Sequence, residues 1–405
     1  MNRYVVVSRG HEEMNRFVYL DNNGTTRMDP EVKKAVDEAE NLYGNASSMH
    51  ELGRDAEALI EKARKQVSRL IGCEQGKIVF TSGASESNNT VLNIFRDRID
   101  DKVDGRDRII VSAIEHPSII ETVKYLKSRG YKIDLCPVDH VGKVKMDELR
   151  KLMGKDVALV SVMTGNNEIG TIQPVAEIAA LAHSYGAYMH TDATQAIGKI
   201  PVEMEKWGVD YLSCSGHKFY GPKGEGVQAF GQGVPFTPFM HGGHQEQGYR
   251  AGTYNTPDIV GLGVAAELAQ KNLKEEHDKL WHLREMLREG LVAAIPDVVV
   301  NGPTEEKDIL PGTLDMSFPC AEGESILLYL DLDGIEVSTG SACASGSLEP
   351  SYVLLACGID VELAHGSIRF SFGRYNTEED VRYVIEKLPP IIARLRKMST
   401  RKLHK

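Results

Sequence analysis

The sequence has little cysteine and no clustering of it, which excludes two common ways of stabilising a chain. Six cysteines occur among 405 residues, with no CxxC pair and no zinc-finger spacing. A disulfide framework or a structural zinc site normally shows such spacing. We therefore expect reduced, mostly buried thiols and a fold that its hydrophobic core stabilises.

Long apolar runs are lacking too. Nothing reaches the roughly 18 uninterrupted apolar residues that a membrane-spanning helix needs. Residues 1–10 also lack the apolar centre of a secretory signal. We expect a cytoplasmic protein that does not bind membranes.

Positive charge is scarce, since 47 basic residues face 58 acidic ones and the formal net charge is -11. Nucleic-acid-binding surfaces need an excess of basic residues to displace phosphate counterions. Direct binding of nucleic acid is therefore not expected, and small substrates or protein partners are favoured. The length and the 41% hydrophobic content are typical of a globular protein with about two or three domains.

Seven short β-rich runs alternate with helix-length segments, which predicts a mainly parallel sheet covered by helices. The runs are residues 77–81, 108–113, 132–138, 157–163, 187–191, 211–214 and 226–230. A long helix over 264–294 follows, and then shorter strands and helices that indicate a second, smaller domain. Ligands of parallel sheets bind at the carboxyl ends of the strands, so the residues after each run are candidates for a functional site.

A lysine follows the run at 211–214, within the stretch Ser215-Gly216-His217-Lys218. An amine held at a strand end can form a Schiff base with pyridoxal phosphate, which also needs phosphate donors such as Ser215 and His217. An isolated lysine is more often a solvated surface residue. The other contacts of such a cofactor must therefore be found as well.

Two further strand ends carry suitable groups. Asp192 is the only carboxylate that follows the run at 187–191, where it could keep a pyridine nitrogen protonated, and Gln195 could donate to a ring hydroxyl. The alternative for Asp192 is a helix cap. Residues 81–88 bring small side chains and hydroxyls to the beginning of a helix, whose amides suit a phosphate, although an ordinary N-cap loop has the same composition.

A histidine and an asparagine complete the set of strand ends. His116 follows the run at 108–113, where it could stack on a ring or move protons, although a lone histidine is more often structural. Asn167 follows the run at 157–163 and offers an amide to the ring hydroxyl or to the substrate. Four strand ends thus converge on one predicted cofactor.

The motifs YLDNNGTT, FTSGAS, EHPSI, GNNEIG, HTDATQ, SGHKFYGPKG, RAGTYN and SIRFS occur in this order between residues 19 and 371. In this combination the chain resembles the cysteine desulfurases of the NifS/IscS type, members of the class V aminotransferase family with the fold type I of pyridoxal phosphate enzymes. The resemblance implies an α/β large domain over 31–275 with a mainly parallel seven-stranded sheet. It also implies a smaller α+β C-terminal domain over 276–405 and an N-terminal segment, 1–30, that packs with the small domain.

The resemblance also assigns the cofactor's contacts. Lys218 would hold pyridoxal phosphate, Asp192 its pyridinium nitrogen, Gln195 and Asn167 the side of its ring hydroxyl, and His116 its ring face, with a catalytic role as well. The phosphate would be bound by Ala84, Ser85, Ser215 and His217, and by Thr253 of the partner subunit, which makes a homodimer the expected unit. The sequence departs from the family pattern at Gly24, Ser85 and Glu225, where alanine, threonine and an apolar residue are usual.

Cys343 is the residue that distinguishes between the reactions possible on this cofactor. It lies among Gly, Ser and Ala in residues 338–350, where little apolar packing would explain a buried thiol. The resemblance implies that Cys343 is the mobile sulfur-accepting cysteine, and a ligand of a cluster shared with a scaffold partner. Arg369 would clamp the substrate's carboxylate in a planar bidentate pair, with Asn167 beside it.

The function that the resemblance implies is conversion of L-cysteine to L-alanine with transfer of the sulfur to Cys343 as a persulfide. An iron-sulfur scaffold protein or another acceptor would then take the sulfur, for iron-sulfur cluster biogenesis and as a further use for tRNA thiolation. Two alternatives remain open. One is a selenocysteine lyase or another transaminase or lyase on the same cofactor, and the other is a catalytically silent partner of a scaffold protein.

Overall fold

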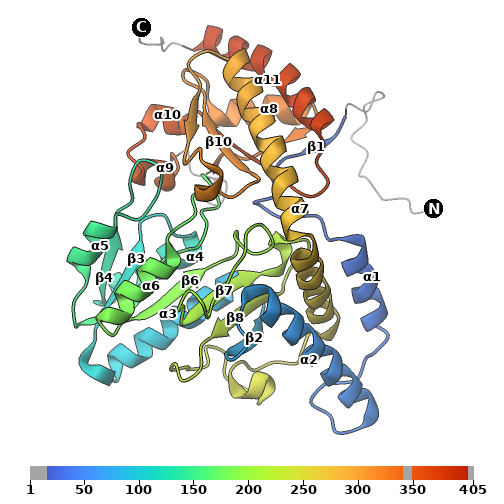
Figure 1. Cartoon of the computed structure of the whole chain (residues 1–405), viewed down its shortest axis with the longest axis vertical. Coiled ribbons are helices and arrows are strands. Elements are labelled where there is room, and N and C mark those ends of the chain that lie inside the picture. The colour runs from blue at the N-terminus through green and yellow to red at the C-terminus, as the bar shows by residue number, and fades with distance from the viewer. Residues whose placement is uncertain (1–15, 341–348, 400–405) are drawn as a thin grey trace.

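The computed structural model describes residues 16–340 and 349–399, and a seven-stranded sheet forms the centre of its larger part (Figure 1). Across the sheet the strands are β2 (Lys77–Thr81), β8 (Gly226–Phe230), β7 (Tyr211–Ser215), β6 (Tyr188–Asp192), β5 (Val157–Ser161), β3 (Arg108–Ser112) and β4 (Lys132–Cys136). Only β8 in this sheet runs against its neighbours β2 and β7. The predicted mainly parallel α/β sheet is confirmed.

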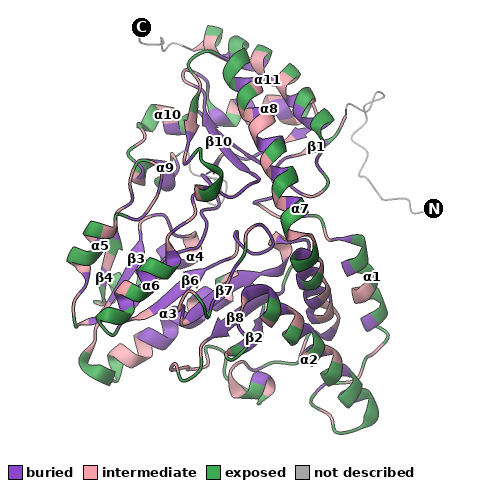
Figure 2. Cartoon of the chain, viewed as in Figure 1, coloured by how far each residue is buried: buried purple, intermediate pink, exposed green. Residues whose placement is uncertain are grey.

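These strands form where the sequence has short, almost continuous hydrophobic runs, as is typical of strands that are covered on both faces. All five residues of β5, Val157–Ser161, are buried. The helices on one face include α3 (Ala84–Asp100) and α4 (Pro117–Ser128), where Phe95 and Val123 belong to one buried cluster with Ile109 of the sheet. Figure 2 shows the buried strands between helices whose outer sides are exposed.

The larger buried cluster contains residues from the remaining helices of this part of the chain. They are α1 (Pro30–Ala39), α2 (Glu51–Ile71), α5 (Met146–Leu152), α6 (Val175–Ser184) and the beginning of α7 (Thr256–Ala294). Short 3-10 turns, at Val103–Gly105, Gln245–Gly248 and Glu306–Asp308, occur in the connections.

A second buried cluster lies at the other end of the molecule. It is built on a three-stranded antiparallel sheet in the order β12 (Ser367–Ser371), β10 (Thr313–Ser317), β9 (Val299–Asn301). Helices α8 (Gly323–Leu332) and α11 (Glu378–Met398) pack in this cluster, and α11 begins with a capping box between Thr377 and Asp380. The buried residues of α9 (Tyr352–Ala356) and α10 (Val361–His365) belong to the larger cluster instead. This part has the α+β composition that the sequence predicts.

Helix α7 links the two clusters. Its first half, with Ile259 and Leu262, packs in the larger cluster, and its second half, with Leu283 and Leu287, packs in the smaller one (Figure 1). The helix begins at Thr256 rather than at residue 264, because Pro257 lies in its first turn, where a proline needs no amide partner. Since α7 runs unbroken through residue 275, the domain boundary there stays a prediction.

The N-terminal part of the described chain also joins both clusters. Strand β1 (Val18–Tyr19) pairs in parallel with β11 (Ile335–Glu336), and the amide of Ser371 donates to the carbonyl of Leu20 at 2.7 Å. The segment that follows, residues 21–26, then reaches the large sheet, where the amide of Thr26 donates to the carbonyl of His217 at 2.9 Å. Within 16–340 and 349–399, no helix is long and apolar enough to cross a membrane.

Candidate active site

The predicted site residues follow different strands of the large sheet, at the edge where their carboxyl ends meet. His116 follows β3, Asn167 follows β5, Asp192 ends β6 and Lys218 follows β7. The segment of residues 21–26 contacts several of them through its backbone and side chains. The parallel sheet therefore brings these groups to one place.

Lys218 ends a 3-10 turn, Gly216–Lys218, directly after β7. Its half-buried side chain donates from Nζ to the carbonyl oxygens of Asn23 and Gly24, at 2.6 Å each. The turn is tight, because a Cβ at Gly216 would lie 2.7 Å from the Leu262 side chain. The amine is thus held at the strand end by a well-packed turn.

Asp192 is buried and accepts two hydrogen bonds from neutral donors. Nδ2 of Asn88 lies 2.7 Å from its Oδ2, and the amide of Thr194 lies 2.9 Å from its Oδ1. The contact with the amide of Thr194 is a local cap, as the capping alternative predicts, but it involves only Oδ1 of Asp192. The other oxygen, Oδ2, accepts from Asn88.

Asn88 and Ser118 connect Asp192 to His116. Nδ2 of Asn88 lies 2.8 Å from Oγ of Ser118, which in turn lies 2.8 Å from Nδ1 of His116. Sequence reasoning missed both residues, although they lie inside the stretches 81–88 and 115–119. Asn88 is one helical turn after the beginning of α3, a spacing that could have indicated its inward position.

The imidazole of His116 is held neutral. Burial lowers its pKa, an effect that Asp192 opposes and Lys218 reinforces. Because Nδ1 accepts a hydrogen bond from the amide of Ser118 at 3.1 Å, the neutral ring carries its hydrogen on Nε2. His116 can therefore accept a proton at Nδ1 and donate one from Nε2.

A second lysine, Lys199, lies buried beside Gln195. Its Nζ donates to Oε1 of Gln195 at 2.7 Å and to Oδ1 of Asn23 at 3.0 Å. Burial, together with the nearby charge of Lys218, lowers the pKa of Lys199 to about 7. Because Oε1 of Gln195 accepts from Nζ, Nε2 of the same amide is turned toward the carbonyl of Asn23 and donates to it at 2.9 Å.

Lys199 was also missed by sequence reasoning. A lysine four residues after Gln195, directly after the stretch Ala196-Ile197-Gly198, was the available signal. On the helical spacing of three to four residues, such a side chain shares a face with Gln195.

The beginning of α3 fits a phosphate group. Gly83 is the N-cap residue, makes no side-chain cap and has a φ of 146°, which side chains other than glycine rarely allow. A Cβ at Gly83 would lie 3.7 Å from Oγ of Ser215, so this hydroxyl faces the first turn, where Ala84 and Ser85 lie. The positive end of the helix dipole favours an anion at this point.

His217 adds a donor at the same end of the sheet. Its Nδ1 lies 3.0 Å from Oγ1 of Thr25, and burial lowers its pKa to about 4, with contributions from the charges of Lys218 and Lys223. An anion bound among these groups would offset the repulsion between a protonated His217 and the two lysines. The charge pattern thus matches a phosphate.

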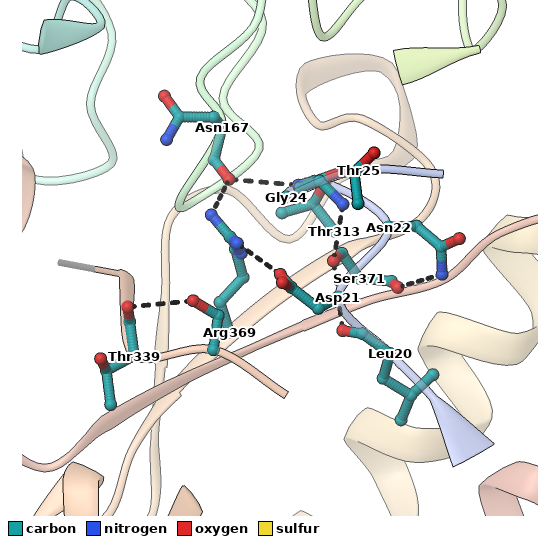
Figure 3. A network of polar contacts seen from close by, with 12 residues as sticks. Leu20, Asp21, Asn22, Gly24, Thr25, Asn167, Thr313, Thr339, Arg369 and Ser371 are labelled. Carbon is teal, nitrogen blue, oxygen red and sulfur yellow. Dashed lines mark hydrogen bonds and ion pairs between the residues drawn. The ribbon is translucent and has the colours of Figure 1, made fainter. Parts of the chain in front are cut away.

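Arg369 lies on β12, next to the same segment of residues 21–26 (Figure 3). Its Nη2 pairs with Oδ1 of Asp21 at 2.7 Å, and its Nη1 donates to the carbonyl of Asn167 at 3.0 Å. The contact of Asn167 is therefore made by its backbone, and Figure 3 shows its side-chain amide pointing away from Arg369. Arg369 and Asn167, both predicted to contact the substrate, are brought together.

Thr253 and Cys343 stand apart from this set. Thr253 is exposed at a cavity of about 230 Å³ that Ser82, Glu225 and Arg250 also line, whereas Lys218 does not line this cavity. Cys343 lies outside the described residues. The described flanks of residues 341–348 attach on the Arg369 side of the site, since the amide of Arg369 donates to the carbonyl of Ser338 at 2.7 Å and Oγ of Ser351 donates to Oε2 of Glu168 at 2.5 Å.

Comparison with known proteins decides the family. Residues 18–384 match the Aminotransferase class-V family. This chain belongs to the class-V aminotransferases. Among its relatives are cysteine desulfurase IscS of Dictyoglomus turgidum, 45% identical over 95% of this chain and 97% of the relative, and cysteine desulfurase NifS of Azotobacter vinelandii, 43% identical over 94% of each.

Solved structures agree with this membership. A NifS-like protein is 40% identical, with a TM-score of 0.86 over 94% of this chain and 100% of that one. A NifS-like protein from Rickettsia africae is 32% identical, with a TM-score of 0.84 over 93% of this chain and 100% of that one. The predicted family and the predicted fold type I are therefore confirmed.

Class-V aminotransferases use pyridoxal phosphate, and the described residues of this class-V aminotransferase fit that group. Three atoms shielded from solvent, Oδ1 of Asn88, Oγ1 of Thr194 and Nε of Arg369, have no hydrogen-bond partner among the described residues. Each belongs to, or directly contacts, a residue of the predicted site, and such orphaned groups normally have a partner. The cofactor prediction is confirmed by the family, while the individual site residues stay predictions.

Proposed function

We propose that the chain is a pyridoxal phosphate-dependent cysteine desulfurase that converts L-cysteine to L-alanine and keeps the sulfur on Cys343 as a persulfide. One observation carries the proposal beyond family membership. The amine of Lys218 and the guanidinium of Arg369 contact the same short segment, residues 21–24, from opposite domains of the predicted division. An amino acid held between them would present its amino group to the cofactor and its carboxylate to the arginine.

The related structures support cysteine as the substrate. One of them, titled SspA in complex with cysteine, is 28% identical, with a TM-score of 0.77 over 89% of this chain and 100% of that one. The bound cysteine belongs to that protein. For this chain, the site offers two anchors, the amine of Lys218 and the guanidinium of Arg369, for an amino acid of that size.

The residues of this chain would act as follows. The bound cofactor supplies an aldehyde for the amino group and an electron-accepting ring. Lys218 takes the Cα proton of the substrate, and the buried carboxylate of Asp192 keeps a proton on the ring nitrogen. His116, neutral with its hydrogen on Nε2, moves a proton at the ring face.

The sulfur transfer needs no external oxidant. The thiolate of Cys343 attacks the substrate's sulfur, the carbon–sulfur bond breaks and a sulfur–sulfur bond forms. A proton then replaces sulfur on the substrate's β-carbon, so that cysteine and a thiol become alanine and a persulfide. Arg369, whose Nη1 donates to the backbone carbonyl of Asn167, would hold the carboxylate end throughout.

A homodimer is part of the proposal. Thr253 of the partner subunit would complete the phosphate site that Ala84, Ser85, Ser215 and His217 begin. Several large hydrophobic side chains are available for burial in a dimer, among them Tyr43, Met49 and Phe239, which are 84%, 92% and 44% exposed in the single chain. We further propose an iron-sulfur scaffold protein as the sulfur acceptor, with Cys343 as a cluster ligand and tRNA thiolation as another use. The cytoplasmic location stays a prediction.

The test begins with the visible spectrum of the purified holoprotein, followed by addition of L-cysteine and a thiol reductant. Alanine and sulfide should appear in equal amounts. Cys343→Ala should keep the cofactor's visible band and lose sulfide release, whereas Lys218→Ala should lose the covalently held cofactor. A keto acid product would indicate transamination instead, and a protein that stays colourless with added cofactor would be a silent partner.

A further inference from the structure

Arg369 has one carboxylate partner among the described residues. Its side chain is 5% exposed and pairs through Nη2 with Asp21, whose side chain is 29% exposed. The neighbouring acids have other partners, since Oδ1 of Asp315 accepts from Asn301 at 2.6 Å and Oε2 of Glu168 accepts from Ser351. Asp21, the more exposed partner of the pair, thus occupies Nη2 of the guanidinium (Figure 3).

The pair leaves the arginine incompletely satisfied. Nε of Arg369 is buried and has no hydrogen-bond partner within residues 16–340 and 349–399, and only Oδ1 of Asp21 lies in hydrogen-bond range of Nη2. A free carboxylate can take two donors of a guanidinium at once, in a planar bidentate pair. Asp21 makes one hydrogen bond to the guanidinium, whereas a ligand's carboxylate could make two.

The backbone of Asp21 is held by hydrogen bonds, and its side chain is partly exposed. Its carbonyl accepts from the hydroxyl of Tyr19 at 3.0 Å and from the amide of Gly24 at 3.0 Å. A Cβ at Gly24 would overlap the Asp21 carboxylate, with Cγ at 2.9 Å and Oδ1 at 3.0 Å. Gly24 therefore provides the space in which the carboxylate reaches Arg369.

We propose that Asp21 is a built-in competitor for the substrate's carboxylate, held on Arg369 by the space that Gly24 leaves, and that substrate binding displaces it. This inference rests on the proposed function, in which Arg369 binds the substrate's carboxylate. The competition weakens binding of every carboxylate ligand by the same factor. It therefore raises the KM for the amino acid without changing kcat.

The probe for the test is propionate, which has a carboxylate but no amine and so cannot react with the cofactor. Its binding to the holoprotein is measured by calorimetry for the wild type, Asp21→Asn, Gly24→Ala and Arg369→Lys. Removing the competing charge should tighten propionate binding roughly five- to tenfold, the scale of a partly exposed ion pair. Gly24→Ala should act in the same direction, because the added methyl group pushes an intact carboxylate off the arginine.

Two comparisons make the outcome decisive. Arg369→Lys should weaken propionate binding, and Asp37→Asn, which removes an exposed partner of Lys33 on α1, should leave it unchanged. If Asp21→Asn binds propionate as weakly as the wild type or more weakly, Asp21 only orients Arg369 and the inference is wrong. If propionate behaves as expected but the wild type makes no sulfide from cysteine, it is the proposed function that fails.

Discussion

The two halves of the site are held in different ways. On the sheet side, Asp192 receives hydrogen bonds from a neutral amide side chain and a backbone amide, and Lys218 is held by a packed turn. On the side of the three-stranded sheet, Arg369 is held by an ion pair with a partly exposed carboxylate. In the proposed function, the first arrangement would fix groups for a resident cofactor, and the second would let a substrate's carboxylate replace that of Asp21.

This contrast suggests that the cofactor half controls the rate of chemistry, while the substrate half controls binding. Substitutions in the two halves should therefore separate into effects on kcat and effects on KM.

The largest effect is expected from Asp192→Asn. The variant keeps the size of the side chain but removes the negative charge that would stabilise the protonated ring nitrogen. The kcat for sulfide formation should therefore fall more than about a hundredfold. The visible spectrum of the bound cofactor should change as well, which a purely structural role would not explain. An unchanged spectrum and kcat would contradict the assignment of Asp192.

A smaller effect, confined to binding, is expected from Arg369→Lys. The positive charge stays while the planar pair of donors is lost, so KM for cysteine should rise roughly thirtyfold with kcat within a few fold of the wild type. Initial rates over a range of cysteine concentrations measure both constants. A fall in kcat with unchanged KM would place Arg369 in the chemistry rather than in binding.

The smallest effect concerns stability. Burial raises the pKa of Glu225 from its ordinary value of 4.5 to about 8. Between these two values the folded protein keeps a proton that the unfolded chain releases, so the free energy of unfolding decreases as the pH rises from about 5 to 8.

Glu225→Gln should remove this dependence. The variant should match the wild type near pH 5 and exceed its unfolding free energy by on the order of 2 kcal/mol near pH 8.5. Denaturant unfolding at a fixed protein concentration measures the difference, and Glu40→Gln, at an exposed carboxylate, is the matched control. Equal differences at both pH values would exclude titration of Glu225 as the cause.

Much of this fold could be predicted because local patterns determine it. Each of the seven β-rich runs overlaps one strand of the large sheet, since hydrophobic runs between helices favour a buried parallel strand. The beginning of α7 was placed too late, because the stretch from Thr256 to Gly263 contains a proline and two glycines that weaken a helical pattern. Tertiary packing against α1 and α2 overrides that weakness.

The sequence by itself determined which reactive groups stand at which strand ends, because residue type and strand order are both local properties. It identified Lys218, Asp192, His116 and Arg369 as candidates and the family to which the chain belongs. Only the tertiary structure decided how these groups are paired and charged. Asn88 contacts Asp192 and Asp21 pairs with Arg369 across separations of 104 and 348 residues, which no local pattern records. Burial, which lowers the pKa of His116 and of Lys199, exists only once the chain has folded.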